Sequence, residues 1–216
     1  MSLPIQHVHA ILDRSGSMNG KTDDVIGGFR SNIDNLREEN DFEIMVSAKM
    51  FDNEEVIILP SINVKTLSEQ KLNDALKLYI PRGQTALRDA VGNSLTFFIN
   101  LFKMTPFHSC MIYVMTDGLE NASKNPLFFP EKLKELIKKG EECNIKVFYV
   151  GSNQDAILNA ANIGISEGQA INFDDTGEET VQAVFRGLSA VASRIRTDEK
   201  SEFTQSERAD SVSQPY

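Results

Sequence analysis

The chain has 216 residues, of which 41% are hydrophobic and 25% charged, and its net charge is −9. These proportions are typical of a globular protein, exclude a wholly disordered or collagen-like chain, and suit one domain or one domain with a tail. The excess of acidic side chains argues against general nucleic-acid binding, because these side chains repel the phosphate backbone.

The N-terminal half alternates between strand-like and helix-like patterns. Apolar residues recur at every third or fourth position in the helical segments and at every second position in 42–51. We expect Asp52-Asn53 to form a tight hairpin turn, Pro60 to end the third strand, and Thr66 with Glu69 to form a capping box. The expected strands are 5–12, 42–51 and 54–59, and the expected helices are 21–39, 67–79 and 86–102.

The C-terminal half continues the alternation. Residues 110–116 are almost wholly apolar, which is typical of a parallel strand covered on both faces. Thr176 and Glu179 have the spacing of a capping box before the last long helix. The expected strands are 110–116, 145–150 and 169–173, and the expected helices are 130–143, 154–163 and 177–196.

The order of these elements predicts an α/β fold. We expect a doubly wound, mostly parallel six-stranded sheet with one antiparallel edge strand and helices on both faces. From residue 197 the composition turns polar and the apolar spacing ends, which predicts a domain over 4–196 and a disordered tail over 197–216. In open sheets of this class ligands bind beyond the carboxyl ends of the strands.

Polar side chains follow two of the buried strands and precede one helix. Asp13, Ser15 and Ser17 form the pattern D-x-S-x-S directly after the first strand. Thr85 lies in the loop before helix 86–102, and Asp117 directly follows strand 110–116. We expect all five at one rim of the sheet, where their hard oxygen atoms suit Mg²⁺ or Mn²⁺ and do not suit zinc.

Three segments carry a family resemblance: Asp13 to Ser17, the G-x-T-A-L of 83–87 and the T-D-G of 116–118. Together and in this order they resemble a von Willebrand factor type A (vWA) domain with a metal-ion-dependent adhesion site. The resemblance covers about 4–196, although Gln84 stands where the family usually has a second glycine. The segment 151–156 resembles bacterial and phage-encoded members.

The resemblance implies a Rossmann-like fold and a role for each of the five residues. Ser15 and Ser17 would bind Mg²⁺, or Mn²⁺, directly, and Thr85 would do so in the ligand-engaged state. Asp13 and Asp117 would act partly through water, and an open position would accept an Asp or Glu side chain of a protein partner. The chain is then a metal-dependent protein-interaction module.

Other interpretations stay open. The serines and Asp13 are also common in ordinary turns, and the metal site could be vestigial in a structural subunit of a larger assembly. A metal-dependent hydrolase is disfavoured, because the sequence lacks a phosphate-binding loop, a nucleophile elbow and a histidine partner for Ser15. We therefore expect no enzymatic activity. His7 and His9 are expected to be structural, since no third ligand matches them.

We expect a cytoplasmic protein that does not contact a membrane. No run approaches the ~18 apolar residues of a membrane helix. The first residues lack the basic segment and apolar run of a secretory signal. Cys110 and Cys143, the two cysteines, are expected to be reduced. In the loop 118–129, Leu127, Phe128 and Phe129 are expected to staple the entry of the next helix, with an apolar contact beside the metal as the alternative.

Overall fold

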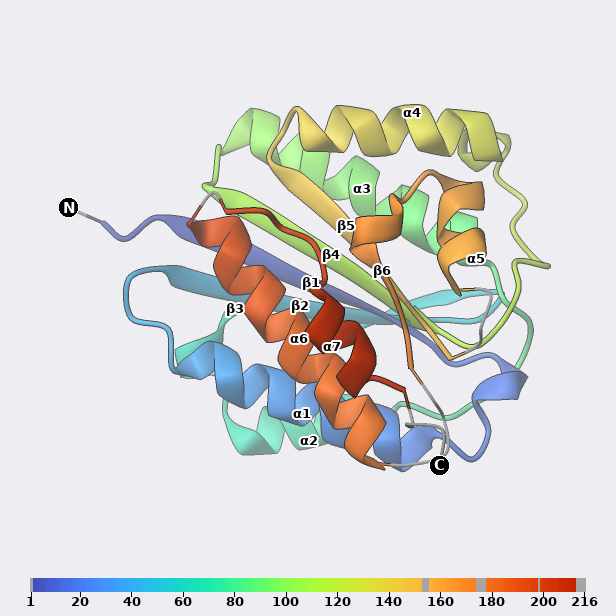
Figure 1. The fold of residues 1–216 in the computed structure, drawn as a ribbon, viewed down its shortest axis with the longest axis horizontal. Helices are drawn as coiled ribbons and strands as arrows, with labels where there is room; N and C mark the ends of the chain where they lie inside the picture. Colours follow the sequence, from blue (N-terminus) through green and yellow to red (C-terminus); the bar gives the residue numbers. More distant parts are fainter. Residues whose placement is uncertain (1, 153–155, 174–177, 198, 213–216) are drawn as a thin grey trace.

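The computed structural model describes residues 2–152, 156–173, 178–197 and 199–212. At its centre lies one six-stranded sheet (Figure 1). The strands are β1 (Ile5–Asp13), β2 (Glu43–Phe51), β3 (Glu55–Asn63), β4 (Ser109–Thr116), β5 (Ile145–Gly151) and β6 (Ala170–Asn172). Their spatial order is β3-β2-β1-β4-β5-β6, and β3 alone among these strands runs antiparallel to its neighbour. The predicted fold class is confirmed.

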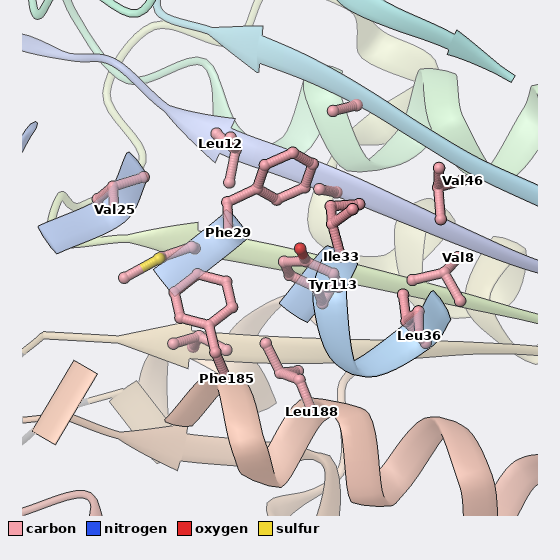
Figure 2. Packing of buried hydrophobic residues seen from close by; sticks show 14 of the residues in the cluster. Val8, Leu12, Val25, Phe29, Ile33, Leu36, Val46, Tyr113, Phe185 and Leu188 are labelled. Atoms are coloured by element: carbon pink, nitrogen blue, oxygen red, sulfur yellow. The ribbon is translucent and has the colours of Figure 1, made fainter. Parts of the chain in front are cut away.

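Helices cover both faces of the sheet (Figure 1). On one face lie α1 (Thr22–Arg37), α2 (Glu69–Leu76), α6 (Glu178–Arg196) and α7 (Gln205–Asp210), and on the other lie α3 (Leu87–Met104), α4 (Pro130–Glu141) and α5 (Ala156–Ile163). Each face buries its own apolar cluster. Figure 2 shows Phe29 of α1 and Phe185 of α6 on the same face of the sheet. The Phe185 ring lies against Gly28 of α1, so these two helices pack against each other as well as on the sheet.

The register of the parallel strands positions the functional rim. Along β1 and β4, Gln6 lies opposite Ser109 and Leu12 lies opposite Met115. The next residues, Asp13 and Thr116, therefore end the two strands side by side. Every residue of β4 is buried, which agrees with a parallel strand covered on both faces.

Two local predictions about β3 and α2 are wrong. β3 continues through Pro60 to Asn63, because an edge strand tolerates a residue without an N–H and the β2–β3 register shifts at this point. The N-cap of α2 is Ser68, whose hydroxyl accepts a hydrogen bond from the backbone N–H of Lys71 at 3.2 Å. Thr66 instead lies in a preceding 3₁₀ turn, so it forms no capping box with Glu69. The box predicted at Thr176 lies outside the described residues.

The prediction of a disordered tail is wrong for 199–212. Thr204 and Glu207 form a capping box at the start of α7, and Glu207 also pairs with Arg194 of α6 at 2.8 Å. Phe203 is only 5% exposed and contacts the ring of Phe148 on β5. One aromatic anchor and one capped turn thus hold a polar segment whose composition resembles that of a disordered chain. None of the described helices is long and apolar enough to cross a membrane.

Candidate metal centre

Asp13 lies at the bottom of the rim site, at the carboxyl end of β1, and is fully buried. Its Oδ1 accepts a hydrogen bond from the backbone N–H of Ser15 at 2.6 Å, and its Oδ2 accepts one from the hydroxyl of Thr116. The hydroxyl of Tyr79 donates to its backbone carbonyl. The carboxylate is therefore held in one orientation from β4 and from its own loop.

The serines of the D-x-S-x-S loop and Asp117 form a continuous chain of oxygen atoms. Ser15 Oγ lies 3.1 Å from Ser17 Oγ, and Ser17 Oγ donates to Asp117 Oδ1 at 2.6 Å. Ser15 is buried, whereas Ser17 is exposed. The candidate ligand oxygens therefore extend from the buried Asp13 to the solvent-exposed Ser17.

Thr85 is 2% exposed and is clamped by the loop that follows Asp117. Its backbone N–H donates to Asn121 Oδ1 at 2.9 Å, and its carbonyl accepts from the N–H groups of Asn121 and Ala122. Gly118 leaves room for the threonine, because a Cβ there would lie 2.7 Å from Thr85 Oγ1 and 3.5 Å from Asp13 Oδ2. Thr85 Oγ1 thus lies on the same side of Gly118 as the Asp13 carboxylate.

Main-chain bonds join the loop after β1 to the loop before α3. The N–H of Gly16 donates to the carbonyl of Gly83 at 3.2 Å, and that of Arg82 donates to the carbonyl of Arg14 at 2.6 Å. Below them the buried Asp52 carboxylate lies 3.1 Å from Arg14 Nε and 2.9 Å from Arg82 Nε. The two loops that carry Asp13 and Thr85 are therefore fixed relative to each other.

The structure brings all five predicted residues together, and their oxygen atoms fit a small divalent cation. Around an octahedral Mg²⁺ with bonds of ~2.1 Å, neighbouring ligand oxygens lie about 3 Å apart. The Ser15–Ser17 separation of 3.1 Å matches that spacing. Two carboxylates and three hydroxyls make this a hard, oxygen-only set. No group of three His, Cys, Asp or Glu residues that could hold a metal lies within the described ranges, so the three hydroxyls are essential to the set.

The electrostatic environment of the buried Asp13 carboxylate favours a bound cation. Burial raises the pKa of Asp13 to about 6, the negative charge of Asp117 adds to the rise, and hydrogen bonds from Thr116 and Ser15 oppose it. A carboxylate held ionised in such surroundings lacks the solvation that water provides. A bound cation would supply that compensation.

Sequence reasoning missed four residues that shape this site: Thr116, Tyr79, Asn121 and Lys21. Thr116 belongs to the T-D-G segment, so its position at the end of a buried strand was a usable signal. Lys21 Nζ donates to Asp117 Oδ2 at 2.7 Å. The expected helix 21–39 included Lys21, so its position as the N-cap of α1 became evident only in the structure. Tyr79 and Asn121 carry no sequence signal, since tertiary packing alone brings them to the rim.

The histidines of β1 lie in the core, as expected for structural residues. His9 bonds to the hydroxyls of Ser47 at 2.8 Å and Ser94 at 3.1 Å, and burial lowers its pKa to about 3. His7 packs on the rings of Phe98 and Phe107, and burial lowers its pKa to about 4. Both imidazoles are therefore neutral at pH 7 and lie apart from the rim donors.

The remaining predictions concern thiols and aromatic residues. Cys110 and Cys143 are free, as expected. In the loop before α4, Phe128 is buried and its ring occupies the space beside Gly92 of α3. Leu127 and Phe129 are exposed, at 62% and 50%. The segment thus anchors the entry to α4 through one ring and leaves two apolar side chains at the surface. Residues 153–155 of the segment that resembles bacterial and phage-encoded domains lie outside the described residues.

No protein-family model and no curated protein matches this sequence. Solved structures do match its fold. The PilB minor pilin from Streptococcus sanguinis aligns with a TM-score of 0.65 and 16% identity, over 91% of this chain and 62% of PilB. The vWF domain of the type V pili tip protein Mfa5 from Porphyromonas gingivalis aligns with a TM-score of 0.65 and 9% identity, over 89% and 96% of the two chains.

A third similar structure carries a metal. Proximal thread matrix protein 1 (PTMP1) from the mussel byssus, solved with a zinc-occupied MIDAS motif, aligns with a TM-score of 0.64 and 12% identity, over 89% of this chain and 49% of PTMP1. At such low identities these matches establish the fold, which is that of vWA domains. The chain spans less than two thirds of PilB and about half of PTMP1.

Proposed function

We propose that this protein is a metal-dependent protein-interaction module, which works by binding and not by catalysis. The observation that carries the proposal is the gathering of Asp13, Ser15, Ser17, Thr85 and Asp117 at one rim, with oxygen spacing suited to Mg²⁺ or Mn²⁺. The vWA fold of its structural neighbours, among them a zinc-bound MIDAS, supports this reading.

The buried and the solvent-exposed residues of the site have different roles. Asp13 and Thr85, both buried, hold the inner side of the donor set, and Ser17 faces solvent at its outer side. A bound divalent cation would supply an open coordination position for a carboxylate oxygen of an Asp or Glu on the partner protein. Hydroxyl ligands are neutral, so they leave the cation electrophilic enough to accept that foreign carboxylate.

The first test is calorimetric titration of chelator-treated protein with Mg²⁺, Mn²⁺ and Zn²⁺. Wild type should show saturable binding that Asp13→Asn abolishes. Asp74→Asn is the matched control, because Asp74 is an exposed aspartate of α2 that pairs with Lys77 and lies outside the donor set. No binding by wild type would refute metal-dependent interaction by the wild-type protein and leave the structural-subunit interpretation.

The second test addresses the partner carboxylate. A short capped peptide with one glutamate should bind the metal-loaded protein, and the same peptide with glutamine should not. Chelation should abolish the binding. Equal binding of both peptides would contradict carboxylate recognition, and turnover of a phosphoester panel would favour the hydrolase instead.

The cytoplasmic location and the bacterial or phage origin stay predictions. The similar structures come from pili and byssus, and they do not favour a cytoplasmic location.

A further inference from the structure

Lys21 occupies a position that local helix rules disfavour. It is the N-cap residue of α1, where Ser, Thr, Asp and Asn prevail because their oxygens accept hydrogen bonds from the first free N–H groups. A lysine has no acceptor, and its ammonium group is repelled by the positive end of the helix dipole. At this position Lys21 therefore gives the helix end neither a cap nor a favourable charge.

The ammonium group of Lys21 reaches across to the metal centre. Its Nζ lies 2.7 Å from Asp117 Oδ2 and 3.3 Å from Ser152 Oγ. The Lys21 and Asp117 side chains are 19% and 5% exposed, so the pair is largely shielded from water. The other oxygen of Asp117 accepts from Ser17, which belongs to the proposed donor set. Asp117, one of the two carboxylates of that set, is thus already paired with a positive charge of the protein itself.

We propose that Lys21 is an internal cation that competes with the divalent metal for Asp117 and so sets the metal affinity of the site. The proposal rests on the proposed function. The Lys21 ammonium group and a divalent metal bound at Asp117 would repel each other, so each disfavours the other. In a partly buried site solvent and salt screen this repulsion less than at the surface. The ion pair also stabilises the metal-free state, because it neutralises a shielded carboxylate.

The test compares Lys21→Met with wild type. Methionine keeps the length of the side chain and removes its charge. In calorimetric titration with Mn²⁺ or Mg²⁺ the variant should bind at least about tenfold more tightly, the size of shift that a close like charge produces. Lys21→Arg, which keeps the charge, should remain near wild type. Lys77→Met removes one charge and one exposed Lys–Asp pair at the C-terminal end of α2 and should change the affinity less than twofold.

A thermal-unfolding series gives a second readout. In chelator, Lys21→Met should melt below wild type, because Asp117 loses its counter-charge. Added Mg²⁺ should raise its melting temperature more than that of wild type. Metal binding by Lys21→Met but not by wild type would also support the role of Lys21. Equal or weaker affinity of Lys21→Met, with wild type binding, would overturn the role of Lys21 only, whereas no binding by any variant would overturn the proposed function together with it.

Discussion

Asp13→Asn should stabilise the metal-free protein at neutral pH while abolishing metal binding. The pKa of the buried Asp13 carboxyl is raised from 3.8 to about 6. Between these values the folded state holds a proton that the unfolded chain has released, so stability falls as the pH rises through about 6. At 1.36 kcal/mol per pKa unit, the ionised carboxylate costs roughly 0.5 kcal/mol at pH 4 and about 3 kcal/mol at pH 8.

Urea unfolding in chelator at pH 4 and pH 8 measures this cost. Asparagine cannot ionise, so the stability advantage of Asp13→Asn over wild type should grow by roughly 2–3 kcal/mol between the two pH values. Any change in hydrogen bonding with Ser15 or Thr116 is independent of pH in this range and cancels from that difference. Saturating Mg²⁺ at pH 8 should stabilise only wild type. A pH-independent difference between the two proteins would refute the reasoning about burial of the Asp13 charge.

Two further predictions concern packing. Gly27 and Gly28 are neighbours in α1, but a Cβ at Gly27 meets open space while one at Gly28 overlaps the ring of Phe185. Alanine at Gly27 should therefore raise the unfolding free energy by about 0.5–1 kcal/mol and alanine at Gly28 should lower it by about 1–3 kcal/mol; the same sign for both would contradict the α1–α6 packing. Phe203→Ala should cost about 3–5 kcal/mol in urea unfolding, whereas Leu158→Ala, at a 60% exposed position, should change little; equal effects would mean that 199–212 is not docked.

The sequence by itself determined the order of the elements as far as α6 and predicted the five residues that lie together at one rim of the sheet. Apolar periods of two and of three to four distinguish strands from helices locally, and their alternation leaves few topologies open. Asp13, Thr85 and Asp117 were recognisable because each stands at a strand end or helix entry, and in a parallel sheet the strand ends share one edge. No long-range contact had to be known for these conclusions.

The tertiary structure alone decided what depends on neighbours distant in sequence. Pro60 stays within β3 because the strand lies at an edge, and Phe203 is buried because β5 offers it a surface. Thr85 is clamped by Asn121, and Lys21 lies on Asp117 rather than in solvent. Local patterns record the preference of a segment for helix or strand. They do not record which distant charge or ring will compensate a residue that breaks the local rule, because that compensation exists only once the chain has folded.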